Sequence, residues 1–325
     1  MFAIVAREFG GPEVLALAEQ SDPRPGPGEI RVRVHAVGVN PYDTYMRAGG
    51  YAITPELPYT PGADAAGVID ELGDGVTGLR AGDRVYIGGT VKNRAYGAYA
   101  SMVLCQPHQV HPLPERLSFA QGAAINVPYA TAWRALFQRA QAVKGESILV
   151  HGASGAVGVA VTQMAHAAGL TVIGTASTDE GAALVRAQGA DHVVNHREPG
   201  YLEQVTALTG GGPNVIIEML ANQNLDHDLA ILAKYGRIVI IGNRGRVEID
   251  PRRIMGKEAA VMGMVFWNLA GDDLALIHTE MGKGFADGTL TPVVSRELPL
   301  AEAAQAHRLV MEPGAKGKIV LIPWS

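Results

Sequence analysis

Between residues 147 and 242, short apolar segments alternate with helix-like segments, and this alternation constrains the fold more than any other feature. Parallel strands need a crossover between them, which a helix of about ten to fifteen residues supplies. The pattern therefore predicts an α/β fold, a doubly wound parallel sheet with helices on both faces. The expected strands are Ser147–His151, Thr171–Ala176, His192–His196, Val215–Leu220 and Arg237–Gly242, and the expected helices run through Ala168 and over Asp179–Gln188, Glu198–Thr209 and Leu225–Ala233.

The first expected strand leads into a glycine-bearing turn, GASGAVG, at residues 152–158. A strand, a tight turn and a helix start in this order direct backbone N–H groups and the positive end of a helix dipole at one point, where a phosphate can bind. Gly155 and Gly158 hold the second and third glycine places of the dinucleotide-binding fingerprint, and Ala153 stands at the first. The position after the first strand favours dinucleotide binding over a purely structural turn. Ser154 is interpreted as a donor to phosphate, because the segment lacks the final glycine of a nucleophile elbow.

The end of the second strand indicates which nicotinamide coenzyme binds. An NAD site usually has an acidic residue there, whereas this strand ends at Ser177. Asp179 and Glu180 follow closely, but Ser177 to Glu180 also fits a helix capping box, which is the favoured interpretation. A small Ser177 leaves room for a 2′-phosphate and so favours NADP(H). His196 or Arg244 could supply the positive counter-charge, and the alternative for His196 is an ordinary surface histidine.

The first 120 or so residues have a different pattern, typical of β structure. Ile30–Val37 alternates apolar and polar side chains, and turn signals recur at Pro25–Glu29, Leu72–Val76 and Ala81–Asp83. This spacing predicts a compact, barrel-like β domain. Gly317–Pro323 is a further expected strand, which could return to this domain. We therefore predict a catalytic domain of residues 1–123 and 266–325 and a dinucleotide-binding domain of residues 124–265.

Composition limits the remaining classes of protein. The 325 residues carry a formal charge of −5 and provide no basic footprint, so nucleic acid is an unlikely partner. The longest apolar stretch, near Ala259–Trp267, is far shorter than the roughly 18 residues of a membrane span. A single cysteine, Cys105, fits a reducing, cytoplasmic setting and is expected to be buried. No metal site is expected at His192 and His196, and Glu218 is expected to cap or to form an ion pair.

Several segments together resemble a known family. In the first domain they are Glu8–Leu15, Val34–Tyr51 and Leu57–Ile69; in the second they are Val150–Gly158, Asn195–Glu198, Ile216–Asn222 and Glu248–Arg252. The first group is similar to the medium-chain dehydrogenase/reductase superfamily, and the second resembles its zinc-independent quinone oxidoreductases of the zeta-crystallin type. The resemblance covers essentially the whole chain. It implies a GroES-like β-barrel catalytic domain, a Rossmann domain that binds NADP(H), and reduction of a quinone in the cleft between the two domains.

The same resemblance implies that zinc is absent. Zinc-dependent members have a cysteine near the Gly-Val pair and a histidine in a Gly-His-Glu motif. This chain has Val37 and Asn40 around Gly38-Val39, and Gly62-Ala63-Asp64 in place of Gly-His-Glu. The cysteine-rich lobe of those members is replaced by a short glycine-containing loop near Gly88–Tyr99.

Site residues follow from the resemblance position by position. It implies substrate contacts from four residues, namely Asn40, Tyr45, Tyr51 and Pro128. It implies coenzyme contacts from Tyr45, Ser154, Gly155, Ala156, Val157, Gly158, Ser177, His196, Asn224, Ile241, Gly242, Asn243, Arg244, Met264, Val265 and Phe266. Relatives commonly pair their last coenzyme-domain strands across a dimer, so Ala259–Phe266 is the expected interface of a homodimer or homotetramer.

Two other functions are also compatible with the sequence. The same fold supports NADPH-dependent reduction of activated C=C bonds in enones or alkenals, for which a tyrosine in the cleft could donate the proton. The other is a non-catalytic NADPH-binding protein, since some relatives are lens crystallins or bind RNA.

Overall fold

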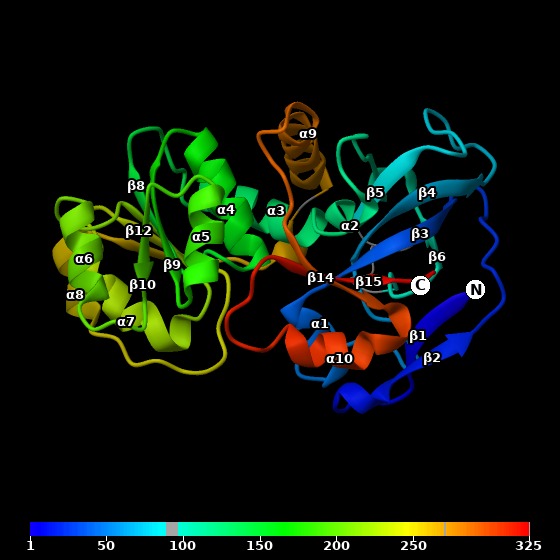
Figure 1. Ribbon diagram of the computed structural model, residues 1–325, viewed down its shortest axis with the longest axis horizontal. Coiled ribbons are helices and arrows are strands. Elements are labelled where there is room, and N and C mark those ends of the chain that lie inside the picture. The colour runs from blue at the N-terminus through cyan, green and yellow to red at the C-terminus, as the bar shows by residue number, and fades with distance from the viewer. Residues whose placement is uncertain (89–96, 270, 325) are drawn as a thin grey trace. The chain divides into compact units, whose positions relative to one another are not determined.

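The computed structural model describes residues 1–88, 97–269 and 271–324 of the chain (Figure 1). These residues divide into two compact units. Unit 1 comprises Met1–Val127, His278–Pro313 and Gly317–Ser325, and unit 2 comprises Pro128–Ile277 and Gly314–Lys316. The domain boundaries predicted at 123/124 and 265/266 stay a prediction. Most of the loop predicted at Gly88–Tyr99 lies outside the described residues.

Unit 2 is built on a six-stranded sheet in which every neighbouring pair of strands is parallel. The strand order is β10-β9-β8-β11-β12-β13, which is the doubly wound arrangement predicted from the alternation of strands and helices. The sixth strand, at one edge, was not predicted. The strands are β8 (Ser147–Val150), β9 (Thr171–Ala176), β10 (His192–Asn195), β11 (Val215–Glu218), β12 (Arg237–Ile240) and β13 (Ala260–Gly263).

The helices of unit 2 follow the predicted segments with shifted starts. The sixth helix begins at Tyr201 rather than Glu198, because Gly200 precedes it in a left-handed conformation with φ +81°. The seventh begins at Ala221, four residues before the expected start. The helices are α4 (Ala156–Ala167), α5 (Asp179–Ala187), α6 (Tyr201–Leu208), α7 (Ala221–Ile231) and α8 (Pro251–Lys257), with a 3₁₀ turn η5 (Phe266–Asn268) after β13.

Unit 1 contains a seven-stranded sheet and a separate pair of strands. The main sheet has the order β14-β15-β3-β4-β5-β7, with β6 paired to β3. Its end strands β14 and β7 are not paired to each other among the described residues, so the predicted barrel is not closed. The strands are β1 (Phe2–Ala6), β2 (Leu15–Glu19), β3 (Ile30–Val39), β4 (Asp64–Leu72), β5 (Arg84–Gly88), β6 (Met102–Cys105), β7 (Val110–Pro112), β14 (Val294–Pro299) and β15 (Lys318–Ile322).

The chain's last strand, β15, pairs antiparallel with β3, which confirms that the C-terminal segment returns to the first domain. The core around this sheet consists mainly of small and branched apolar side chains, with Tyr59 and Tyr99, and Cys105 is buried in it, as predicted. The remaining helical segments are η1 (Pro12–Val14), α1 (Pro41–Arg47), η3 (Pro107–Gln109), α2 (Phe119–Gly122), α3 (Asn126–Trp133), the π-helical η4 (Arg134–Arg139), α9 (Gly271–Asp287), η6 (Leu300–Glu302) and α10 (Ala303–Leu309).

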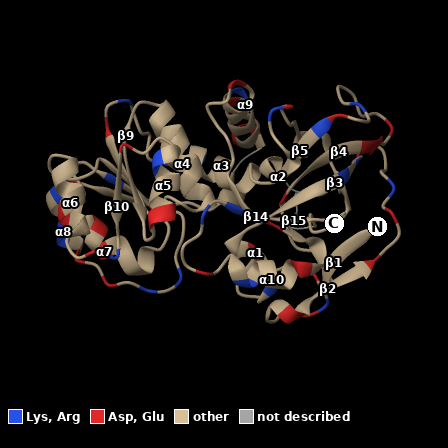
Figure 2. Ribbon diagram, viewed as in Figure 1, with Lys and Arg blue, Asp and Glu red and all other residues tan. Residues whose placement is uncertain are grey.

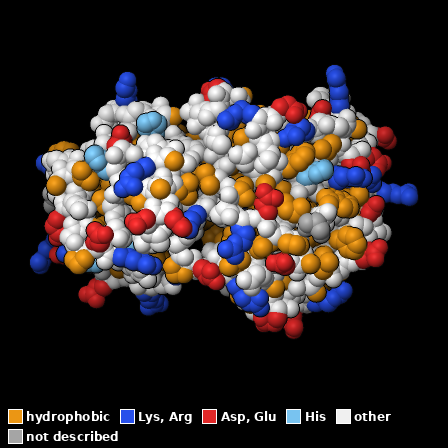
Figure 3. All heavy atoms as spheres, viewed as in Figure 1, with side chains coloured by type: hydrophobic (Ala, Val, Ile, Leu, Met, Phe, Trp, Pro, Cys, Tyr) orange, Lys and Arg blue, Asp and Glu red, His pale blue; other side chains and the backbone are white. Residues whose placement is uncertain are grey.

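Basic and acidic residues are interspersed along the chain in both units (Figure 2). On the face drawn in Figure 3, basic and acidic groups of the described residues alternate with apolar ones and do not gather into one extended basic region. Among the described residues, no helix combines the length and the apolar character needed to cross a lipid bilayer.

Candidate coenzyme and substrate sites

The turn after β8 has the close packing that phosphate-binding turns require. Gly152 has φ +58°, and a Cβ on Gly158 would lie 2.6 Å from the Cα of Ala153, so a side chain at residue 158 would force α4 away from the turn. Ala153 is fully buried, and its Cβ would lie 2.9 Å from any Cβ at Gly174 on β9. The residue at the first glycine place therefore packs into the sheet.

The start of α4 fits an anionic group. Gly155 precedes the helix, and its N-cap position carries no side-chain cap. The first N–H groups of a helix have no partner within it, and they lie at the positive end of its dipole. Ser154, Gly155, Ala156 and Val157 are half-buried, and Gly158 is buried behind them. These predicted contact residues form one continuous N–H-bearing turn that fits a coenzyme diphosphate.

The end of β9 differs in one detail from the prediction. Thr178, and not Ser177, caps α5, since its Oγ1 accepts the N–H of Gly181 at 3.1 Å. The cap therefore lies one residue later than predicted, and the predicted capping box is wrong, because Gly181 at the third helical position has no side chain to complete it and Glu180 forms an ion pair with Lys316. Strand β9 is thus followed by Ser177 and Thr178, without the carboxylate that an NAD site usually has at this strand end, and the next acids lie in α5.

The other predicted coenzyme residues of unit 2 follow the carboxyl ends of parallel strands, so they lie along one edge of the sheet. His196 follows β10 and is exposed; Ile241, Gly242, Asn243 and Arg244 follow β12; Met264, Val265 and Phe266 follow β13; Asn224 lies on α7. Two contacts that the sequence did not reveal fix these loops. The Asn222 Oδ1 accepts the N–H of Arg244 at 2.9 Å, and Arg134 donates to the carbonyl of Val265 at 2.6 Å.

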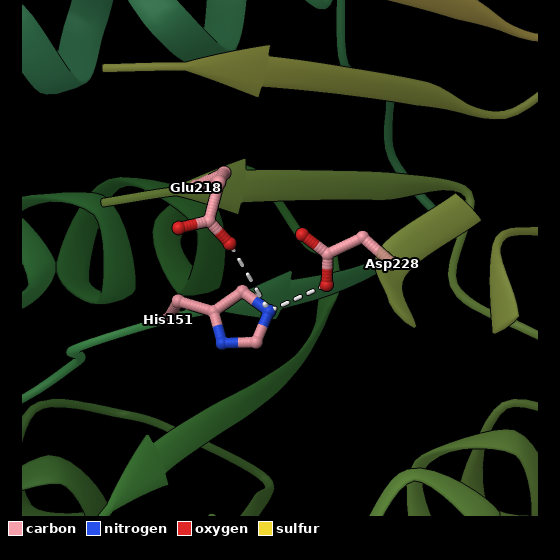
Figure 4. Close-up of side chains that lie close together, drawn as sticks. All are labelled: His151, Glu218 and Asp228. Atoms are coloured by element: carbon pink, nitrogen blue, oxygen red, sulfur yellow. Dashed lines mark hydrogen bonds and ion pairs between the residues drawn. The ribbon is translucent and has the colours of Figure 1, made fainter. Parts of the chain in front are cut away.

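A buried cluster of three ionisable side chains lies at the same edge (Figure 4). His151 follows β8, Glu218 ends β11 and Asp228 lies on α7. The His151 Nε2 lies 2.7 Å from Asp228 Oδ1 and 3.5 Å from Glu218 Oε2. Glu218 Oε1 accepts the N–H of Leu220 and the side-chain amide of Asn224. Glu218 thus caps and forms an ion pair, as predicted, whereas the roles of His151 and Asp228 were not predicted.

In unit 1 the predicted substrate residue Asn40 belongs to a buried polar network. Its Oδ1 accepts from Lys318 Nζ at 2.6 Å, and its Nδ2 donates to Asp64 Oδ2 at 2.9 Å. Lys318 also pairs with Asp64 Oδ2 at 2.7 Å. The other oxygen, Asp64 Oδ1, accepts from Asn126 Nδ2 and from the backbone N–H of Val127. Every contact of Asp64 thus comes from a donor, and the carboxylate is neutralised by the side chain of Lys318.

Helix α1, which carries Asn40 at its N-cap and Tyr45, is fixed by a second network. The Asp43 carboxylate accepts the Asn40 N–H at 2.8 Å and the Tyr99 hydroxyl at 3.3 Å. Tyr99 lies 3.1 Å from His307 Nε2, and Arg47 lies 3.2 Å from His307 Nδ1. Burial raises the pKa of Asp43 to about 7, although these hydrogen bonds favour its charged form.

The predicted substrate residues Tyr45 and Tyr51 lie together in unit 1. The Tyr45 and Tyr51 rings are 6.4 Å apart between centroids, and Tyr42 lies 5.7 Å from Tyr51. Tyr45 and Tyr51 are half-buried, so part of each ring is accessible. Pro128 is buried in α3 and belongs to unit 2. The structure therefore groups three of the four predicted substrate residues, Asn40, Tyr45 and Tyr51, on or next to α1.

Residues 26–115 match the family model of the alcohol dehydrogenase GroES-like domain, and residues 156–276 match that of the zinc-binding dehydrogenases. A quinone oxidoreductase of Rattus norvegicus is 46% identical over 99% of this chain and 98% of its own length. The chain belongs to the quinone oxidoreductase family.

Solved structures agree with that membership. A quinone oxidoreductase of Escherichia coli in complex with NADPH has a TM-score of 0.89 and 30% identity, over 99% of this chain and 100% of that one. A protein described as an NAD-dependent alcohol dehydrogenase has a TM-score of 0.92 and 31% identity, over 99% of both chains. The medium-chain dehydrogenase/reductase fold of this enzyme is thereby confirmed, and likeness of fold alone does not distinguish the two coenzymes.

The Lys318–Asp64 pair yields a prediction about stability. Replacing Lys318 by Met leaves Asp64 buried without its cation, and we expect the free energy of unfolding to fall by about 3–5 kcal/mol in urea denaturation. The matched control is Lys316→Met, two residues away, which removes the half-exposed pair with Glu180 and should cost less than about 1 kcal/mol. Equal losses in the two variants would contradict this role of Lys318.

Proposed function

We propose that the enzyme is an NADPH-dependent quinone reductase that acts without zinc. The observation that carries this proposal is the phosphate-fitting turn from Gly152 to Gly158, in a chain that matches quinone oxidoreductases over nearly its full length. The turn accounts for coenzyme binding, and the family accounts for the class of substrate.

The choice of NADP(H) over NAD rests on the end of β9. Ser177 is small and half-buried, and the two acids that follow it, Asp179 and Glu180, belong to the first turn of α5, where Glu180 is paired with Lys316. His196, after β10, and Arg244, in the loop after β12, are both exposed, and either would supply a positive or hydrogen-bonding group to a 2′-phosphate. The relative from Escherichia coli, whose structure holds NADPH, supports the same choice.

Action without zinc is supported by the residues around Asp64. The position that the resemblance assigns to a carboxylate of the zinc motif is filled by Asp64, whose oxygens are fully occupied by Lys318, Asn40, Asn126 and the Val127 N–H. Thiolate and imidazole ligands are missing from the matching positions, since Val37, Asn40 and Ala63 stand there. A divalent cation beside the buried Lys318 ammonium would be repelled.

Reduction of a quinone by NADPH requires the protein mainly to position the two reactants. Bound NADPH supplies the reducing equivalents, and a quinone is electrophilic enough to accept them without strong acid catalysis. We propose that Asn40, Tyr45, Tyr51 and Pro128 contact the quinone. The Tyr45 hydroxyl, and the amide hydrogen of Asn40 that is not bonded to Asp64, would donate hydrogen bonds to the quinone oxygen as negative charge develops. The networks through Lys318 and Asp43 hold these donors in place.

A substrate panel tests the proposal. We expect NADPH oxidation with benzoquinone or phenanthrenequinone, much slower oxidation of NADH, and no loss of rate in a chelator. Faster turnover of enones or alkenals than of quinones would replace the proposal by the double-bond reductase. NADPH binding without turnover of either panel would indicate a binding protein, crystallin-like or RNA-binding.

The role of Tyr45 gives a separate prediction. Tyr45→Phe keeps the ring and removes only the hydroxyl, so we expect kcat with a quinone to fall by less than about tenfold, because the hydroxyl acts by hydrogen bonding and not as an obligatory acid. The matched control is Tyr235→Phe, at an exposed tyrosine of unit 2, which should leave kcat unchanged. A loss near a thousandfold at Tyr45 would instead identify it as a general acid.

We also propose that the enzyme is a homo-oligomer joined through β13, the edge strand of the unit 2 sheet. The N–H groups of Ala260 and Met264 bond to carbonyls of Gly236 and Ile240 on the β12 side. Since bonding alternates along a strand, the N–H groups of Val261 and Gly263 face away from β12, where a strand of a second chain could accept them.

Gly263 allows this interface to be tested. A Cβ added there meets open space, so Gly263→Pro should fold while removing one outward N–H, and we expect light scattering to show a shift toward monomer. Gly263→Ala, which keeps the N–H, is the control and should stay oligomeric. A wild-type monomer, or an unchanged oligomer in the proline variant, would contradict an interface at β13.

A further inference from the structure

The cluster of His151, Glu218 and Asp228 cannot balance its charges without a proton. Glu218 and Asp228 have no exposed surface, and His151 is 4% exposed. With both carboxyl groups ionised, one imidazolium leaves a buried net negative charge. Glu218 Oε2 and Asp228 Oδ2 also have no hydrogen-bond partner among the described residues while both groups are carboxylates. One proton on the carboxyl pair, together with a charged His151, makes the cluster neutral and gives these oxygens a donor.

The distances favour a hydrogen-bonded cluster over a metal ion. One nitrogen of His151 and one carboxylate oxygen each of Glu218 and Asp228 lie within 4.8 Å of one another, a spacing at which they could also bind a cation. Two ligands on a tetrahedral zinc ion lie about 3.3 Å apart, given metal–ligand distances near 2.0 Å. The His151 Nε2–Asp228 Oδ1 distance of 2.7 Å is shorter and is that of a charge-assisted hydrogen bond.

The protonation preferences of the groups agree with this arrangement. Burial raises the pKa of Glu218 to about 7, against the opposing effect of His151, and the nearby Asp228 raises it further. Burial alone would lower the pKa of His151, but the charge and hydrogen bond of Asp228 and the charge of Glu218 outweigh it, so this pKa is raised. His151 is thus held as the cation, and the carboxyl pair takes or releases a proton near neutral pH.

The cluster is bonded to residues that we propose for coenzyme binding. His151 immediately precedes Gly152, the first residue of the phosphate-fitting turn. Glu218 binds Asn224 through its side chain, and its carbonyl accepts the N–H of Ile241 at 2.9 Å. The same three loops that would surround the coenzyme's phosphates and ribose are therefore bonded to the cluster.

We propose that binding of the anionic coenzyme is coupled to uptake of one proton by the buried Glu218–Asp228 carboxyl pair, with His151 fixed beside it as a positioning residue. This inference rests on the proposed NADPH-dependent function. The proton comes from solvent buffer and ends on a carboxyl oxygen, and no other bond forms or breaks. Bound phosphates repel a second negative charge on the pair, so the coenzyme and the proton favour each other's binding.

Other titratable groups face the cluster and must be separated from it. His196, after β10, interacts electrostatically with His151, and Tyr201, on α6, interacts with Asp228 and Glu218. On α7 itself, Asp226 pairs with Arg253 of α8 at 3.0 Å. Partial burial, then the charges of His151 and Arg197, lower the pKa of His196. His196 is the group whose titration most resembles the proposed effect, because it is also a proposed contact of the 2′-phosphate.

The test is calorimetric titration of the full-length protein with NADPH near pH 7.5, in buffers of different ionisation enthalpy, which gives the number of protons taken up. At this pH the 2′-phosphate, with a second pKa of about 6, is almost fully ionised and contributes little. We expect about 0.3–0.8 proton per coenzyme, because a pKa of about 7 leaves about a quarter of the pair protonated before binding, and an affinity that falls by at most about tenfold per pH unit above pH 7. Below pH 7 the carboxyl pair is already protonated, so the dependence should flatten there.

Glu218→Gln and His196→Asn form the matched pair of variants. Glutamine keeps an oxygen for Leu220 and Asn224 and places an N–H where the proton would be, so Glu218→Gln should fold, bind NADPH and take up almost no proton. His196→Asn should weaken binding but keep the uptake. An infrared carboxyl band that increases on NADPH binding in the wild type and is absent from Glu218→Gln would locate the proton.

The outcomes separate this inference from the proposed function. NADPH binding with no proton uptake in the wild type, or with equal uptake in Glu218→Gln, overturns the inference and leaves the function intact. Loss of uptake in His196→Asn alone assigns the proton to that histidine and also overturns it. Coenzyme binding that disappears in EDTA would indicate a metal ion at the cluster, and no binding of NADPH at all would remove both proposals.

Discussion

The ion pair between Lys318 and Asp64 joins segments of unit 1 that are 254 residues apart in sequence. Asp64 begins β4 and Lys318 begins β15, so the pair connects a central strand of the sheet to the strand that comes last in the sequence. Burying two charges is costly unless further hydrogen bonds satisfy them, and here Asn40, Asn126 and the Val127 N–H provide those bonds. The starts of α1 and α3 are thereby fixed relative to β4, together with the amide that we propose binds the quinone.

The buried charged groups of unit 2 differ in number from those of unit 1. In unit 1, the Lys318 ammonium lies 2.7 Å from the Asp64 carboxylate, so one cation faces one anion and the pair carries no net charge. In the His151 cluster, one imidazole faces two carboxyl groups, so fixed charges alone cannot balance. Only a mobile proton or a ligand can make up the difference. Such an imbalance at the phosphate-binding edge of the sheet is consistent with a site that responds to an anionic ligand, whereas the balanced pair of unit 1 acts as a fixed frame.

Local patterns predicted the parts of the fold that depend on nearby residues. Strand β9 has the predicted bounds Thr171–Ala176, because both its apolar content and its flanking turns are local. The helix cap after it was assigned one residue early, since Ser177 and Thr178 are both good caps and only the backbone conformation decides between them.

Lys318 could not be predicted, because a lysine at the start of an apolar strand is usually exposed and its partners are more than 250 residues away. Asp228 was missed for the same reason: in a helix with Asp226 and His227 beside it, only tertiary packing shows which acid is buried.

The imperfect glycine fingerprint also has a tertiary explanation. The first glycine of the motif serves a tight turn, and Ala153 has an added methyl group that must be accommodated. That methyl is fully buried, and the residue facing it across the sheet is Gly174, where a Cβ would approach it to 2.9 Å. A glycine on the neighbouring strand thus provides the space that the motif's own glycine would otherwise provide. Gly158 has no such substitute, because its own Cβ would meet the backbone of Ala153, and backbone atoms cannot be exchanged for smaller ones. In this turn the first glycine of the motif can therefore be replaced because the adjacent strand has Gly174, whereas the third, Gly158, cannot.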